Sequence, residues 1–358
     1  MRLVLALTLA VWAGPLAAQD GVACLQSQLS ALGHDPGPVD GTMRPSVRDA
    51  AAAWGGGDAF PGLRRGTATS WCREIGLSDP ALKSHWPSAK PLIIAAETPI
   101  ATALLRQSFE AIQTYFRDIQ GIELATRVAV IGAGEGGFFD PALADVLMQL
   151  ERPARARPID TARLCNGRTV GGAANRPYML FCWPQTVEDP AWQARIAPEL
   201  RRVMAHEYSH QVQYALAADD PAQRVDGVWR LGPHWMVEGV AELVEWQFVS
   251  GQQTTDGADL FDLQTAARRS RLTLDGLDAQ GTVTDSEAYG VARFAAYLLA
   301  QRHGTEALFD YFRALGRGLS QDDAFAQTFG LTPSAYTALF EELRRDYGAA
   351  RRFGRRDP

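Results

Sequence analysis

The chain has 358 residues, of which 46% are hydrophobic and 21% are charged. This composition is typical of a globular protein and allows one large hydrophobic core or two smaller ones. The formal net charge is −6 and the isoelectric point is about 5.6. Because the chain has no excess of Lys and Arg to neutralise phosphates, its composition argues against nucleic acid as a partner.

Residues 1–18 have the pattern of a signal peptide. Arg2 gives a positive start, an apolar stretch runs from Leu3 to Ala13, and small residues follow just before position 19. The apolar stretch is too short to span a bilayer, and the small residues favour cleavage. We therefore expect a bacterial protein that is periplasmic or secreted, with no stable membrane anchor after cleavage. An uncleaved N-terminal tether is the alternative.

The cysteine pattern agrees with export. None of the four cysteines forms a CxxC pair, so neither a zinc ribbon nor a thioredoxin-like site is indicated. An even number in an oxidising compartment predicts two disulfides, although buried free thiols are the alternative. Of the three pairings that four cysteines allow, we favour the two local ones, Cys24–Cys72 and Cys165–Cys182.

Residues 19–80 read as a compact helical module. Leucines at helical spacing predict a first helix that ends at Gly33. A second helix is predicted from Pro45 to Trp54, with turn residues between the two helices. The segment resembles the small three-helix peptidoglycan-binding domain in Leu25-Gln26, Leu29, Leu32-Gly33, Pro36-Gly37, Val39-Asp40-Gly41 and Pro45.

That resemblance implies peptidoglycan as a partner of the module. The chain departs from the family pattern at Arg44, where the family has Gly, at Val47, where it has Thr, and at Trp54-Gly55, where it has Phe-Gln. A helical spacer without a ligand, a propeptide and an inhibitory cap are the alternatives.

Residues 88–350 are predicted to form an α+β domain, with a small mixed sheet followed by a mainly helical half. Strands are expected at Pro91–Ala96, Thr126–Ala133 and Tyr178–Cys182, and a helix at Thr98–Gln120. From Pro190 onward the pattern is almost wholly helical.

The sequence His206-Glu207-Tyr208-Ser209-His210 is an HExxH motif. Residues four apart share one face of a helix, so both imidazoles can reach one ion at about 2 Å. Glu207 lies about 100° around the helix, where it can touch a water bound to that ion. The alternative is a helical surface with two ordinary histidines.

A catalytic zinc needs a third protein ligand and one open position. Glu238 and Glu242 lie four apart on a predicted apolar helix, so Glu238 can bind the ion while Glu242 reaches the free ring nitrogen of a ligand histidine. Glu245, on the same helix, is expected to be a solvated glutamate.

HExxH followed by WxxEGxAE resembles the gluzincin branch of the zincins, in the peptidase MA-like superfamily. The resemblance implies a zincin-like fold with one Zn²⁺ bound by His206, His210 and Glu238, with Glu207 as general base and Glu242 contacting a ligand. No HxxGxxH extension follows His210, which excludes a metzincin.

Tyr289 is the candidate donor to the oxyanion of the transition state, since gluzincins often place a tyrosine in the helix beyond the ligand glutamate. An ordinary core aromatic is the alternative for Tyr289. His234, after Gly232-Pro233, is either a turn histidine or a residue lining the cleft.

These patterns predict an exported zinc peptidase that hydrolyses peptide bonds in a peptide or protein by a zinc-bound water activated by Glu207. The alternatives are a non-catalytic wall-binding protein with a vestigial metallopeptidase fold and a hydrolase of peptidoglycan stem peptides.

Overall fold

The computed structural model describes residues 16–54, 63, 68, 72, 75, 92–124, 127–134, 136–152, 158–165, 169–184, 190–219, 230–251, 257–281, 283 and 285–355. The chain divides into two compact units, residues 1–86 and residues 87–358. Most of the predicted signal peptide lies outside the described residues.

The first unit contains α1 (Leu16–Ala31) and α2 (Pro45–Trp54), and the predicted second helix is confirmed. Buried Gln26 organises the turn between them, because its Oε1 accepts from the backbone N–H groups of Asp40 and Gly41 at 3.1 and 3.0 Å. The Cys24–Cys72 disulfide ties α1 to the last part of the unit. Residues 68, 72 and 75 are helical and buried, and the residues between them lie outside the described part of the chain.

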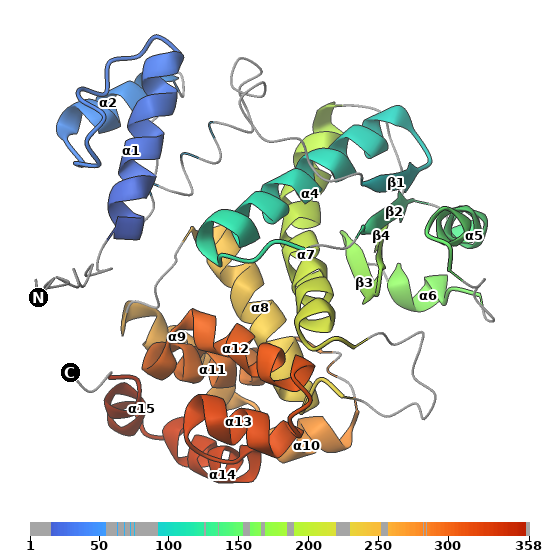
Figure 1. Ribbon diagram of the computed structural model, residues 1–358, viewed down its shortest axis with the longest axis vertical. Coiled ribbons are helices and arrows are strands. Elements are labelled where there is room, and N and C mark those ends of the chain that lie inside the picture. The colour runs from blue at the N-terminus through green and yellow to red at the C-terminus, as the bar shows by residue number, and fades with distance from the viewer. Residues whose placement is uncertain are drawn as a thin grey trace, which may run out of the picture. The chain divides into compact units, whose positions relative to one another are not determined.

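The second unit is α+β, as predicted, with a four-stranded mixed sheet in the order β1-β2-β4-β3 (Figure 1). The predicted strands correspond to β1 (Ile93–Ala96), β2 (Ala129–Ala133) and β4 (Tyr178–Cys182), which run parallel. The edge strand β3 (Gly171–Asn175) is antiparallel to β4 and was not predicted from the sequence. The second disulfide, Cys165–Cys182, is also present.

Alternate side chains of the sheet face two separate helical layers, as the period of a strand requires. Ala129 and Ile131 pack with α5 (Phe139–Gln149), whereas Val130 and Met179 pack with α4 (Pro99–Ile119) and α7 (Pro190–Leu216). The sheet therefore separates α5 and α6 (Thr161–Leu164) from the long helices α4 and α7 (Figure 1).

The helical half follows the sheet, as expected from the sequence. Thr98 caps α4 by accepting from the backbone N–H of Ala101 at 3.1 Å, next to a proline in the first turn. The helix that carries the HExxH motif, α7, begins at Pro190 and includes Pro198. The remaining described helices are α8 (His234–Ser250), α9 (Gly257–Arg269), α10 (Leu274–Ala279), α11 (Ser286–His303), α12 (Thr305–Gly316), α13 (Gln321–Phe329), α14 (Pro333–Leu343) and α15 (Tyr347–Phe353).

The two disulfides are consistent with an exported protein. Within the described ranges, no helix has the length and apolar character required to cross a bilayer.

Candidate metal centre

The HExxH segment lies in the middle of α7 and is buried throughout. Tyr208 anchors the helix in the core, where its ring packs against Phe109 and Phe116 of α4 with ring centroids 5.5 and 5.1 Å away. The two histidines, four residues apart, lie on another face with exposed fractions of only 7% and 8%. Such burial is unusual for solvated surface histidines and indicates that their ring nitrogens have partners inside the protein.

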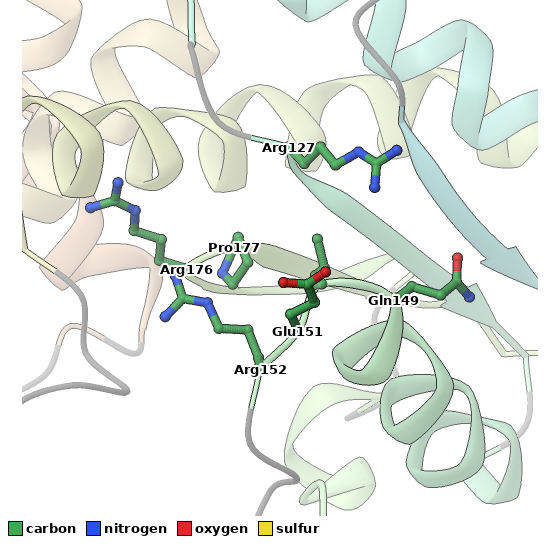
Figure 2. Close-up of a pocket in the computed structure, with 7 residues that line it drawn as sticks. Arg127, Gln149, Glu151, Arg152, Arg176 and Pro177 are labelled. Atoms are coloured by element: carbon green, nitrogen blue, oxygen red, sulfur yellow. The ribbon is translucent and has the colours of Figure 1, made fainter.

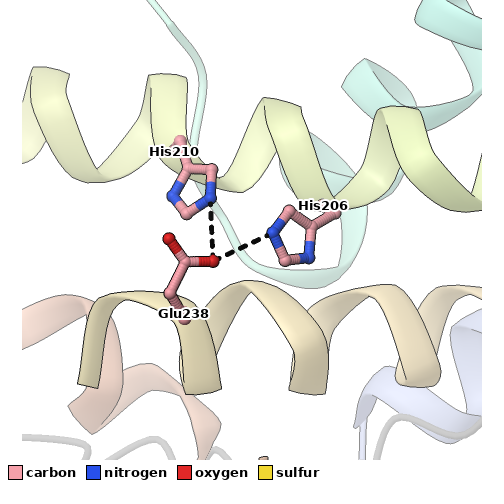
Figure 3. A group of neighbouring side chains, drawn as sticks. All are labelled: His206, His210 and Glu238. Atoms are coloured by element: carbon pink, nitrogen blue, oxygen red, sulfur yellow. Dashed lines mark hydrogen bonds and ion pairs between the residues drawn. The ribbon is translucent and has the colours of Figure 1, made fainter. Parts of the chain in front are cut away.

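The second helix of the site is α8, which lies beside α7 and carries Glu238 (Figure 3). Glu238 Oε2 lies 3.2 Å from His206 Nε2 and 3.5 Å from His210 Nε2. One ligand atom from each of the three residues therefore falls within 4.8 Å of the others. The structure thus brings together the three residues predicted as ligands.

These separations match the size of a small tetrahedral metal ion. Ligand atoms at about 2.0–2.1 Å from one zinc are about 3.3 Å apart, and the two His–Glu separations are 3.2 and 3.5 Å. The donor set of two imidazoles and one carboxylate is also one that catalytic zinc sites use. These buried His and Glu residues could therefore hold a metal ion.

The other side of His206 faces two carboxylates. Glu245 Oε2 lies 3.4 Å and Glu242 Oε1 3.6 Å from His206 Nδ1. Arg202 forms an ion pair with Glu245, and Arg293 lies 3.7 Å from Glu242. Glu242 is thus near its predicted partner.

The prediction for Glu245 was wrong. It is 7% exposed rather than solvated, and it is the carboxylate closer to His206. Its charge is tolerated inside the protein because Arg202, which also contacts Glu199, compensates it.

The pKa values of the site reflect the same contacts. Burial is the largest single effect and disfavours the charged histidines, but the neighbouring carboxylates together outweigh it. Glu238, Glu245 and Glu207 raise the pKa of His206, and Glu238 and Glu207 raise the pKa of His210. Burial acts against ionised Glu238 as well, yet the two histidines lower its pKa. In the absence of a metal, the structure therefore favours protons in the space between these three residues.

Glu207 projects from α7 toward the edge strand β3. A Cβ atom added at Gly172 would lie 2.7 Å from Glu207 Oε1 and 2.8 Å from its Cγ. Burial raises the pKa of Glu207, although the neighbouring histidines act in the opposite direction. Glu207 is thus a carboxylate whose pKa is raised by burial and which lies next to both histidines, and these are the properties of a proton acceptor at neutral pH.

Tyr289 is brought to the site by α11, which packs closely on α8. The two helices touch at Gly239, where an added Cβ would lie 2.3 Å from the Ala292 carbonyl oxygen. This contact explains the glycine of the WxxEGxAE pattern. The Tyr289 ring is half-buried and lies 5.7 Å from that of His206, so it is beside the site and also packs against the core.

His234 starts α8, and its backbone N–H donates to Asp278 Oδ1 at 2.9 Å. Its position is therefore that of a turn residue at a helix start, in agreement with one of the two readings of the sequence.

A hollow of about 350 Å³ lies elsewhere in the same unit, at the amino ends of β2 and β4, and several arginines line it (Figure 2). Arg127 extends to one side, whereas Arg152 and Arg176 extend to the other, with Glu151 between them. Arg176 also donates to the carbonyl oxygens of Tyr214 and Asp219 at 3.3 and 3.1 Å. The guanidinium groups do not converge on one point, so this hollow has no organised anion site.

Sequence reasoning missed Gln213, whose side chain contacts His210. The spacing could have revealed it, since Gln213 lies three residues after His210 on the same helix. Comparison of the chain with protein-family models, curated proteins and solved structures found no match.

Proposed function

We propose that the chain is an exported zinc-dependent peptidase whose metal is held by His206, His210 and Glu238. The observation that carries the proposal is the convergence of these three side chains from two helices, with separations of 3.2 and 3.5 Å from one carboxylate oxygen. Three protein ligands leave a position open, which distinguishes a catalytic zinc site from a structural one.

A bound zinc ion would act as a Lewis acid and would lower the pKa of water toward neutrality. Glu207 then has the role of the general base, since its buried carboxylate accepts a proton at Oε1 or Oε2 and passes it to the departing amine. Glu245 and Glu242 orient His206 by facing its Nδ1. Tyr289 is the proposed hydroxyl donor to the developing oxyanion.

The edge strand β3 supports a peptide as the substrate. It pairs with β4 on one side, and no strand among the described residues pairs with its other side. An extended peptide that adds to such an edge forms backbone hydrogen bonds whatever its sequence. Because Gly172 of this strand lies against Glu207, that peptide would pass beside the general base.

A non-catalytic protein with a vestigial metal site fits these features less well. Structural zinc is usually closed by four protein ligands, and all four cysteines of this chain are in disulfides. A purely structural site also has no use for a buried Glu207. Binding of the first unit to peptidoglycan, and cleavage of peptidoglycan stem peptides, stay predictions from the sequence.

The proposal is tested on the mature chain by measuring zinc content after dialysis and cleavage of a peptide library. Glu207→Gln should retain zinc and lose cleavage by about 100- to 10,000-fold, the usual contribution of a general base. Glu342→Gln, at an exposed position of α14, is the matched control and should behave as the parent. A parent without zinc, or a Glu207→Gln variant with full activity, would refute the proposal.

A further inference from the structure

The side chain of Gln213 joins the two helices that supply the metal ligands. It lies on α7, one turn beyond His210, and it is completely buried. Its Oε1 is 2.9 Å from His210 Nδ1, and its Nε2 donates to the Val237 carbonyl oxygen at 2.9 Å. Val237 is the residue before Glu238, so one amide contacts a ligand of α7 and the backbone next to the ligand of α8.

The direction of these hydrogen bonds follows from the Val237 carbonyl. A backbone carbonyl oxygen can only accept, so the amide nitrogen of Gln213 must face it. The amide oxygen therefore faces His210, and an amide oxygen also can only accept. In the neutral ring, which is the form that binds a metal, His210 Nδ1 must then carry the proton, and Nε2 directs its lone pair to the space shared with Glu238.

We propose that Gln213 is a positioning residue that sets the tautomer of His210 and the placement of Glu238 together. The inference rests on the proposed zinc site and specifies how that site is assembled before an ion enters. It also makes the two histidines unequal, because His206 Nδ1 faces the carboxylates of Glu245 and Glu242 while His210 Nδ1 faces a neutral amide.

A purely structural role for Gln213 makes a different prediction. As an ordinary buried link between helices, its loss would lower stability without a selective effect on metal affinity. Gln264 of α9 provides the matched control, because it is also buried and donates to one backbone carbonyl, that of Leu343, at 2.7 Å. Replacement of either glutamine removes a similar hydrogen bond to a backbone carbonyl, but only Gln213 also contacts a proposed metal ligand.

The test is the zinc dissociation constant of the full chain, measured by competition with a chromophoric chelator, together with thermal unfolding of the metal-free protein. Gln213→Met removes both hydrogen bonds at similar volume and should weaken zinc binding by about 10- to 100-fold, as for other partners of ligand histidines. Gln264→Met should change the affinity by less than about threefold even if it lowers the melting temperature. Gln213→Glu retains an acceptor for Nδ1–H and should recover part of the loss.

Equal zinc affinities for Gln213→Met and Gln264→Met would overturn the inference while leaving the proposed zinc site intact. A parent that binds no zinc would overturn both. A second measurement does not depend on the folding of any variant. Long-range ¹⁵N–¹H NMR of the zinc-loaded parent should show His210 protonated at Nδ1, and a His210 protonated at Nε2 would overturn the inference.

Discussion

Replacement of Gly172 by alanine tests whether the edge strand positions Glu207. The added Cβ would lie 2.5 Å from Val203 Cγ1, 2.7 Å from Glu207 Oε1 and 2.8 Å from Glu207 Cγ. All three are side-chain atoms of α7, so we expect them to move rather than the strand pairing to break. None of the three belongs to a proposed metal ligand, so the ion should remain bound.

The size of the effect follows from these distances. The contact with Glu207 Oε1 must lengthen by about 0.7 Å to reach ordinary van der Waals distance. A misplacement of about 1 Å can reduce turnover by about 100-fold. We therefore expect Gly172→Ala to lower kcat by about 10- to 100-fold, and overpacking to lower the free energy of unfolding by about 1–3 kcal/mol.

The assay compares kcat, KM and zinc content of the parent and the variant on a peptide that the parent cleaves. Gly137→Ala is the control, because an added Cβ there meets no atom within 4 Å. Parent-like kcat in Gly172→Ala would refute the reasoning about the strand. Loss of zinc in proportion to activity would refute the separation of Glu207 from the ligands.

The remaining predictions concern the partners of the histidines. Glu245→Gln should weaken zinc binding by up to about 100-fold relative to the parent, and by more than Glu242→Gln does, because Glu245 is the closer carboxylate at 3.4 Å from His206 Nδ1. Competition with a chelator measures both affinities, and a larger loss in Glu242→Gln would contradict the prediction. The metal-free protein should be more resistant to urea at about pH 5.5 than at about pH 8.5. Equal urea midpoints at the two pH values would contradict the assigned pKa shifts.

The sequence was sufficient to predict that His206, His210 and Glu238 come together because the geometry of the first two is local. Two histidines four apart on a helix share a face whatever the rest of the fold, and an apolar setting for Glu238 indicated a second buried helix. The three parallel strands were also predictable, since each is an apolar segment with strand-forming residues.

The parts that were missed depend on contacts between distant segments. The strand Gly171–Asn175 contains only small residues and asparagine, which have low strand propensity, and it forms because it pairs with β4. Its small side chains are required by the close approach of α7, which no local pattern reveals. Glu245 is buried because Arg202 of another helix compensates its charge, so composition alone suggested a solvated residue.

The charges around His206 and His210 explain the expected pH dependence. Glu207, Glu238, Glu242 and Glu245 are four carboxylates, whereas Arg202 and Arg293 are two guanidinium groups, which leaves a formal charge of −2 when the histidines are neutral.

Uncompensated charge inside a protein is costly, so protons, or a divalent cation when one is bound, would stabilise this site. The pKa of Glu238 is lowered in the folded protein. Ionised Glu238 therefore adds to the free energy of unfolding at pH values above 4.5, the ordinary pKa of glutamate, and this contribution is lost as the pH falls below that value. The pKa values of His206 and His210 are raised in the folded protein. The protonated histidines therefore add fully to the free energy of unfolding at pH values below 6.5, the ordinary pKa of histidine, and this contribution is lost as the pH rises through the raised pKa values. The metal-free protein should therefore be most stable between these limits, and zinc, which replaces the protons, should bind more tightly as the pH rises.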